Sequence, residues 1–193
     1  IHPGLALVSR LAYLEPMTEP LTTSAADQQA LATRLGQALT ANHWTVAAAE
    51  SCTGGGIAAA ITDIPGSSGW FGYGLVTYSN DAKVRLLGVP EQMLIQDGAV
   101  SEPVVRAMAE GAARVSGADL AIAVSGVAGP DGGSEEKPVG TVWLGWAYRR
   151  GEDLVSDARL HQFEGDRAAV RGQTVTAALQ QLLTLTSGNK TTV

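Results

Sequence analysis

Residues 45–56 read Thr-Val-Ala-Ala-Ala-Glu-Ser-Cys-Thr-Gly-Gly-Gly and lead directly into the apolar segment Ile57–Ile61. Small apolar residues followed by a serine and three glycines are typical of a buried strand, a tight turn and the start of a helix. Each glycine lowers helix stability by about 1 kcal/mol relative to alanine, so three in a row indicate that another group lies close to the backbone. The N–H groups and the positive dipole end of a helix N-terminus stabilise a developing negative charge. We therefore interpret Ser51 as a nucleophile with an oxyanion site beneath it.

Other interpretations of the same turn stay open. A serine in front of a helix is often only its N-cap, and glycine-rich turns often only reverse the chain. Cys52 is an alternative nucleophile, because a helix N-terminus lowers the pKa of a thiol. We prefer Ser51 because we expect Cys52 to point the other way, into packing. The pattern is neither a G-x-S-x-G elbow nor a P-loop, since no Gly-Lys-Ser/Thr sequence follows.

Composition and charge limit the class of protein. A chain of 193 residues suits one domain, and 45% hydrophobic but only 5% aromatic residues favour small-residue packing of helices on a sheet. The net charge of −6 argues against nucleic-acid binding, which needs a basic surface. No apolar run approaches the roughly 18 residues of a membrane helix, so we expect a soluble protein without a membrane partner. One cysteine and three histidines give no zinc-ligand spacing, and a single cysteine fits a reducing cytoplasm.

The first residues differ in character from the rest of the chain. Residues 1–16 lack the basic start, apolar core and cleavage site of a signal peptide. Because Met17 opens a natural start, we interpret residues 1–16 as a foreign or disordered leader and residues 17–193 as a single domain.

Apolar periodicity and turn residues predict alternating helices and strands. The predicted helices cover residues 24–42, 54–62, 80 onward, 90–96, 101–117 and 165–187, and the predicted strands cover residues 45–49, 72–78, 120–124, 141–147 and 154–163. Asn80 is expected to cap its helix, and the last two strands to form an antiparallel hairpin. The alternation predicts an α/β protein whose mixed sheet carries helices on both sides.

Lys83 falls in the first turn of the helix that Asn80 begins. The helix dipole disfavours a cation there, and a positive local potential lowers the pKa of a lysine, as a lysine general base requires. The alternative is an ordinary solvated surface lysine, the commonest environment of this residue type.

Two later stretches carry features that a packed core does not explain. Residues 126–140 are too polar and too rich in glycine and proline for a core, so we expect a functional loop, with a simple surface excursion as the alternative. Arg167 and Arg171 share one face near the start of the last helix, where cations are unfavourable unless they hold an anion. Phosphate is the natural candidate because a guanidinium fork binds it bidentately, and ion pairs with Asp166 or Glu164 are the alternative.

Five motifs follow one another along the chain. They are Ala-Glu-Ser-Cys-Thr-Gly-Gly at 49–55, Val-Thr-Tyr-Ser-Asn at 76–80 with Lys83, Gly-Ala-Val-Ser at 98–101, Gly-Val-Ala-Gly-Pro-Asp-Gly-Gly at 126–133 with Lys-Pro-Val-Gly at 137–140, and Gly-Asp-Arg at 165–167 with Arg171. This set closely resembles the CinA C-terminal domain family, the nicotinamide-nucleotide amidohydrolases, over residues 26–186. Ser125 stands where the family commonly has threonine, a mild departure.

The resemblance implies a three-layer α/β/α sandwich and a stand-alone cytoplasmic enzyme that forms homodimers. It implies hydrolysis of the carboxamide of nicotinamide mononucleotide (NMN) to nicotinate mononucleotide and ammonia, by a serine nucleophile without a metal or other cofactor. The alternative from a different functional class is a non-catalytic nucleotide-binding module linked to competence or DNA damage. An amidase that acts on another small amide is a third hypothesis.

Residue patterns and resemblance together predict the catalytic roles. Ser51 attacks the amide carbon, and Lys83 accepts the serine proton and later donates it to the nitrogen that leaves as ammonia. Tyr78 orients Lys83 or the substrate. The predicted oxyanion donors are the N–H groups of Cys52, Thr53 and Gly54.

The predicted substrate-binding set comprises Gly55, Gly126, Gly129, Gly132, Gly133, Arg167 and Arg171. The arginines are expected to bind the 5′-phosphate, and the glycine loop to close over the ribose and the nicotinamide. His2, His43 and His161 lie in no catalytic signature, which disfavours a Ser-His-Asp triad.

Overall fold

One five-stranded sheet, in the order β2–β1–β3–β4–β5, organises the molecule. In the computed structural model, which describes residues 24–188, the strands are β1 (Val46–Glu50), β2 (Phe71–Val76), β3 (Leu120–Gly126), β4 (Thr141–Arg150) and β5 (Asp153–Gln162). β1 pairs in parallel with β2 and β3, whereas β4 is antiparallel to β3 and β5. The predicted mixed sheet is confirmed, and the interpretation of residues 1–16 as a leader lies outside the described residues.

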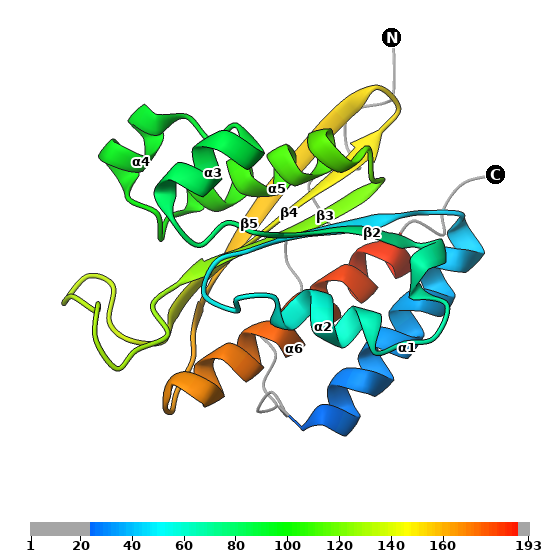
Figure 1. The fold of residues 1–193 in the computed structure, drawn as a ribbon, viewed down its shortest axis with the longest axis horizontal. Helices are drawn as coiled ribbons and strands as arrows, with labels where there is room; N and C mark the ends of the chain where they lie inside the picture. Colours follow the sequence, from blue (N-terminus) through cyan, green and yellow to red (C-terminus); the bar gives the residue numbers. More distant parts are fainter. Residues whose placement is uncertain (1–23, 189–193) are drawn as a thin grey trace, which may run out of the picture.

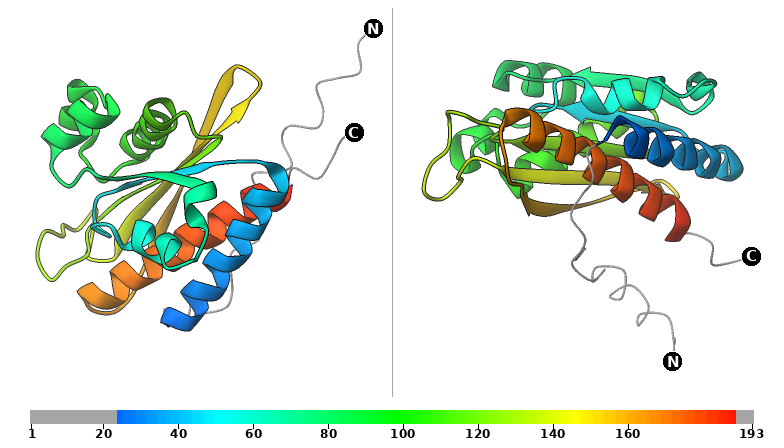
Figure 2. Two further views of the ribbon diagram at one scale, coloured as in Figure 1. Left: turned by 45° about the vertical axis from the view of Figure 1, so that its right-hand side comes forward. Right: turned by 90° about the horizontal axis from the view of Figure 1, so that it is seen from below.

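Helices lie on both sides of this sheet (Figure 1). One side carries α1 (Ala25–Asn42), α2 (Gly56–Thr62) and α6 (Arg167–Gly188), and the other carries α3 (Asn80–Leu87), α4 (Glu91–Asp97) and α5 (Glu102–Ser116). Figure 2 shows α1 and α6 side by side along their shared face of the sheet. The three-layer α/β/α sandwich is therefore confirmed. Within residues 24–188, no helix combines the length and apolarity needed to cross a bilayer.

Strand alternation gives the two core layers different side-chain sizes. Val46, Leu120, Ile122 and Val124 face the layer of α1, α2 and α6, whereas Ala47, Ala49, Ala121 and Ala123 face the layer of α5. The alanine face lets α5 approach the sheet closely, and a Cβ added at Gly145 of β4 would lie 2.6 Å from the Val105 carbonyl oxygen. This close packing explains a chain rich in small residues and poor in aromatic ones.

The predicted helices and strands all form, and the differences are local. The N-cap of α3 is Ser79 rather than Asn80, because the Ser79 hydroxyl accepts the N–H of Ala82 at 3.1 Å. β4 and β5 form the predicted hairpin across a turn at Gly151. Val115 on α5, which the apolar periodicity of the sequence places with Val105, Met108 and Ala112 on one face of that helix, is 49% exposed, and α6 continues through Gly188 instead of ending before it.

The carboxyl ends of β1, β2, β3 and β5 meet at one edge of the sheet, because β5 returns antiparallel to β4. The segments that leave this edge are the Ser51 turn, residues 77–79 before α3, the loop 127–140 and the start of α6. In Figure 1 that loop projects at the left, beyond the sheet. Ligands of open α/β sheets bind outside the carboxyl ends of strands, so the topology gathers the four predicted site segments.

Candidate active site

Ser51 is the first residue after β1, and the sheet fixes its backbone. The Ser51 N–H donates to the Val124 carbonyl of β3 at 3.1 Å. Gly54 and Gly55 then adopt φ angles of +58° and +99°, in the left-handed region that glycine enters without strain. Two of the three consecutive glycines are thus required by the turn, and α2 begins at the third, Gly56.

Lys83 is brought against Ser51 although 32 residues separate them in sequence. Its Nζ lies 3.3 Å from Ser51 Oγ, 2.9 Å from the Thr77 carbonyl oxygen and 3.2 Å from the Tyr78 carbonyl oxygen. The residue is only 1% exposed, so the surface-lysine alternative is wrong. Burial disfavours the ammonium form and lowers the pKa of Lys83 below its usual 10.5. The direction of the shift agrees with the sequence prediction, but its main cause is burial, not the helix dipole.

The two carbonyl oxygens determine what a neutral Lys83 can do. A carbonyl only accepts hydrogen bonds, so Lys83 donates to both Thr77 and Tyr78. A neutral amine has two N–H bonds and one lone pair, and the two carbonyls use both N–H bonds. The remaining position on Nζ, occupied by the lone pair, therefore faces Ser51 Oγ.

Tyr78 joins this pair to the rest of the site. Its backbone carbonyl holds Lys83, while its hydroxyl accepts from Arg167 Nη2 at 3.2 Å. The side chain is 60% exposed, so the ring lies at the open side of the site. Tyr78 thus contacts the lysine through its backbone and Arg167 through its side chain.

Cys52 packs in the core beside α2, as the sequence analysis expects, and is 5% exposed. Burial raises the pKa of the Cys52 thiol to about 11, the opposite of the shift that a helix N-terminus alone would produce. A buried thiol that stays protonated is a poor nucleophile, so the arrangement favours Ser51.

Glu50 is a site residue to which the sequence analysis assigned no role. Its side chain is 0% exposed and accepts hydrogen bonds from Thr53 Oγ1 at 2.5 Å and from the N–H groups of Gly55, Ile57 and Ala58 at 3.0, 3.0 and 2.8 Å. One sequence signal could have revealed it, since a charged residue follows an otherwise apolar run immediately before Ser51.

The N–H groups around the turn consequently form two sets, those that already have a hydrogen-bond acceptor and those that do not. Glu50 occupies those at the start of α2, and the Gly54 N–H donates to the Ser51 carbonyl at 3.1 Å. In the described part of the chain, neither the N–H of Cys52 nor that of Thr53 donates a hydrogen bond to another residue. Of the three predicted oxyanion donors, Cys52 and Thr53 are therefore the two that are available.

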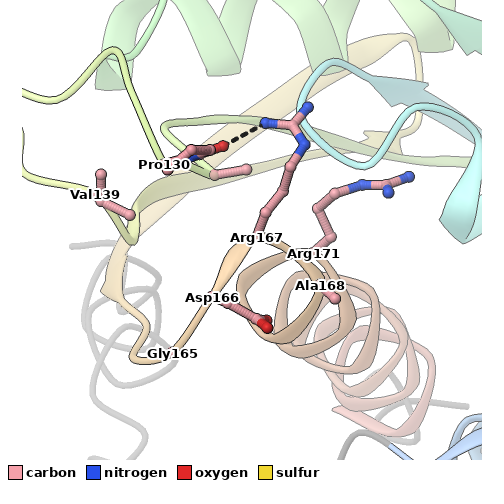
Figure 3. A pocket seen from close by; sticks show the side chains of 9 residues that line it. Pro130, Val139, Gly165, Asp166, Arg167, Ala168 and Arg171 are labelled. Carbon is pink, nitrogen blue, oxygen red and sulfur yellow. Dashed lines mark hydrogen bonds between the residues drawn. The ribbon is translucent and has the colours of Figure 1, made fainter.

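A cavity of about 530 Å³ lies beside the turn, at the start of α6. It is lined by Ala128, Gly129, Pro130, Val139, Gly165, Asp166, Arg167, Ala168 and Arg171. In Figure 3, Arg167 extends from α6 toward Pro130, the guanidinium of Arg171 extends in the other direction, and the Asp166 carboxylate points away from both arginines. The volume of the cavity falls in the range of roughly 300–1,000 Å³ that is typical of small-molecule sites.

Each arginine reaches a segment that carries predicted catalytic groups. Arg167 donates to the Gly129 carbonyl at 2.7 Å as well as to Tyr78, and Arg171 donates to the Thr53 carbonyl at 2.9 Å. The ion pairs recorded among residues 24–188 involve neither arginine, which contradicts pairing with Asp166 or Glu164. The Asp166 carboxylate instead accepts the Ala169 N–H at the start of α6.

The predicted glycines play different parts. Gly129 lines the cavity, whereas Gly55, Gly126, Gly132 and Gly133 are not among its lining residues. Gly126 is needed for packing, because a Cβ there would lie 2.6 Å from the Val142 side chain.

Other groups with catalytic or metal-binding potential lie elsewhere or are not clustered. His161, on β5, stacks on Phe163 with ring centroids 5.1 Å apart, and burial lowers its pKa to about 4. In the stretch from residue 24 to residue 188, no group of three or more His, Cys, Asp or Glu side chains is placed to hold a metal ion.

Comparison with known proteins identifies close relatives. A family model described as the CinA C-terminal domain matches residues 28–186. The nicotinamide-nucleotide amidohydrolase PncC of Pseudomonas putida is 59% identical over 167 residues, which cover 86% of this chain and 98% of the relative. The protein of the same name from Escherichia coli strain K12 is 58% identical over 152 residues, 79% of this chain and 90% of the relative.

Solved structures agree with this grouping. The competence/damage inducible protein CihA from Agrobacterium tumefaciens superposes with a TM-score of 0.77 at 44% identity, covering 82% of this chain and 95% of that one. A CinA superfamily protein from Klebsiella pneumoniae gives 0.78 at 39% identity, covering 83% and 98%.

Proposed function

The chain belongs to the CinA C-terminal domain family, and we propose that it is a nicotinamide-nucleotide amidohydrolase that converts NMN to nicotinate mononucleotide and ammonia. The two relatives described above, both named nicotinamide-nucleotide amidohydrolase, are 59% and 58% identical to this chain over most of its length. The observation that supports the chemistry most directly is the 3.3 Å separation of Lys83 Nζ and Ser51 Oγ, with both lysine N–H bonds directed at backbone carbonyls.

In the first half of the proposed reaction, Ser51 Oγ attacks the carboxamide carbon of NMN while its proton moves to Lys83 Nζ. The N–H groups of Cys52 and Thr53 stabilise the oxyanion of the tetrahedral intermediate, and loss of one such donor typically costs about 3–4 kcal/mol. The intermediate then collapses, and the C–N bond breaks as Lys83 returns the proton to the departing nitrogen. Ammonia leaves, and an ester links the nicotinoyl group to Ser51.

In the second half, water replaces ammonia. Neutral Lys83 accepts a proton from the water that attacks the ester carbon, and the same N–H groups hold the second oxyanion. The ester bond breaks, Ser51 recovers its proton from Lys83, and nicotinate mononucleotide is released. The lowered pKa of Lys83 suits both steps, because the group must be neutral before each attack.

We assign the 5′-phosphate to Arg167 and Arg171, which lie at the cavity beside the turn. A guanidinium has five N–H donors, and the recorded bonds use two from Arg167 and one from Arg171. The remaining donors can bind the oxygens of a phosphate while the existing contacts persist. Gly129 and Pro130, on the 127–140 loop, would then lie over the sugar and the base.

We also propose a homodimer, on the ground of family resemblance alone, and a cytoplasmic location, which the single cysteine fits as well. Sedimentation equilibrium should give about twice the chain mass of 19.9 kDa. A monomer at micromolar concentration would contradict this assignment.

Ammonia release from NMN, measured with and without a chelator, tests the proposed activity. We expect release by the wild type to resist the chelator and to fall by roughly 10⁴-fold or more in Ser51→Ala and in Lys83→Ala, as for the loss of a member of a catalytic triad. Arg85→Ala is the matched control, because Arg85 lies on the same helix as Lys83 but is exposed and, among residues 24–188, forms an ion pair with Asp81 alone. NMN binding by the wild type without ammonia release would favour the non-catalytic module, and an active Ser51→Ala protein would promote Cys52.

A further inference from the structure

The nucleophile turn is built around the buried carboxylate of Glu50, for which the mechanism above has no use. We propose that Glu50 is the positioning residue that holds Ser51 and the oxyanion donors in their reactive arrangement. The inference rests on the proposed function, because it takes Ser51 as the nucleophile.

The surroundings of Glu50 are unusual for a carboxylate. It ends a strand whose five residues are all buried, and the ion pairs recorded among residues 24–188 do not include it. A buried charge without a cation is unfavourable unless hydrogen bonds satisfy its oxygen atoms. All four recorded donors come from the segment immediately after Ser51, namely the Thr53 hydroxyl and the N–H groups of Gly55, Ile57 and Ala58.

These bonds close the turn on itself. The chain leaves Glu50, passes through Ser51, and returns to the Glu50 carboxylate between Thr53 and Ala58. The N-cap of α2 is Gly55, which has no side chain to cap the helix, so Glu50 supplies the cap from the preceding strand. Ser51 therefore lies inside a closed loop that opens only when charge-assisted hydrogen bonds break.

The backbone of Glu50 also helps to position Lys83, the proposed base. Its carbonyl accepts the Thr77 N–H at 2.8 Å, and the Thr77 carbonyl accepts from Lys83 Nζ at 2.9 Å. Glu50 thus fixes the serine turn through its side chain. Through its backbone it fixes Thr77, whose carbonyl binds Lys83. The separation of Ser51 and Lys83 depends on both links.

Glu50 also determines which N–H groups face the substrate. Its carboxylate occupies the first N–H groups of α2, which would otherwise form the obvious anion site at a helix N-terminus. The N–H groups of Cys52 and Thr53 remain for the oxyanion. The cavity, by contrast, is lined by residues from 128–139 and 165–171, none of which donates to this carboxylate, so we expect substrate binding to change little in its variants.

The variant Glu50→Gln tests the proposal, because it keeps the shape of the side chain, removes the charge and turns an NH₂ group toward N–H donors. We expect kcat for NMN to fall roughly 10- to 100-fold with KM changed by less than about threefold, as for a misplaced catalytic group. The rate at which a fluorophosphonate labels Ser51 should fall in parallel. Glu102→Gln is the matched control: Glu102 is an exposed carboxylate in the first turn of α5, and both readouts should stay at wild-type values.

A folded Glu50→Gln protein with wild-type kcat and labelling rate would overturn the proposal, as would a rise in KM at unchanged kcat. If Glu50→Gln does not fold, Thr53→Val replaces it, since this change removes only the hydroxyl that donates to Glu50. A smaller loss of kcat and of labelling rate, roughly 3- to 10-fold, is then expected, and no loss overturns the proposal. Failure of the wild type to release ammonia from NMN would contradict the proposed function instead, and retained hydrolysis by Ser51→Ala would contradict only the choice of nucleophile, so these failures are distinguishable from that of the Glu50 proposal.

Discussion

At the scale of single residues, the titration of Lys83 should control the pH dependence of activity. Only the neutral amine can accept the serine proton, and burial lowers the pKa of this lysine below 10.5. We expect kcat/KM for NMN to rise with pH and to level off above an apparent pKa that is lower than 10.5. If kcat/KM instead falls as the pH increases toward 10.5, the assignment of Lys83 as the base is contradicted.

The same titration affects stability. Between the lowered pKa of folded Lys83 and 10.5, the unfolded chain binds more protons than the folded one, so this residue makes the fold less stable as the pH falls. In Lys83→Met this dependence is absent. Thermal melts of both proteins should therefore show the Tm of the wild type rising, relative to that of the variant, as the pH increases through this window. A constant difference in Tm would show that Lys83 is not buried in its neutral form.

Cys52 should behave as a core residue. With a thiol pKa of about 11 and 5% exposure, it should react with iodoacetamide near pH 8 at least roughly 100-fold more slowly in the native protein than in denaturant. Cys52→Ala should keep most of the activity, because the proposed oxyanion contact uses only its backbone N–H. Rapid native alkylation with loss of activity, together with an inactive Cys52→Ala, would make the thiol the nucleophile.

At the scale of elements, the position of α3 depends on a glycine in its neighbour. A Cβ added at Gly111 of α5 would lie 2.1 Å from the Leu87 carbonyl oxygen at the end of α3. Gly111→Ala must push α3 away, and α3 carries Lys83. A displacement near 1 Å can cost roughly 100-fold in rate, so we expect kcat to fall by at least about 10-fold.

The control for this prediction is Val115→Ala on the exposed side of the same helix, which should leave kcat unchanged. Alanine usually stabilises a helix relative to glycine, so a lower Tm in Gly111→Ala would itself indicate the clash. Unchanged kcat and unchanged Tm in Gly111→Ala would mean that α5 and α3 adjust without moving the lysine.

At the scale of the whole molecule, net charge predicts the behaviour toward nucleic acids. Because the chain has 19 acidic and 13 basic residues, we expect it to be repelled by a phosphate backbone. We expect no shift of duplex DNA in a mobility assay at about 150 mM salt. Saturable binding that weakens as salt increases would contradict this expectation and favour the alternative of a non-catalytic module linked to competence or DNA damage.

The sequence predicted most of the architecture because its evidence is local. Period-two alternation, continuous apolar runs and turn residues identify each strand and helix from a few neighbouring residues. The same kind of evidence singled out Ser51, since a strand, a turn and a glycine-rich helix start are contiguous in the chain. The order β2–β1–β3–β4–β5 and the contacts between helices could not be read in this way, because strand pairing joins segments far apart in sequence.

Tertiary structure alone decided the chemistry of the site. Lys83 is buried beside Ser51 because strand pairing and helix packing bring the two residues together, and burial, a property of the folded molecule, lowers the pKa of the lysine. Glu50 lay beyond the predicted strand 45–49 and had no assigned role, and only the folded turn directs three N–H groups and a hydroxyl at its carboxylate. The sequence by itself determined which elements form and which residue follows β1. Packing determined how charges are desolvated and which donors remain free, because these depend on atoms that come together only when the sheet is assembled.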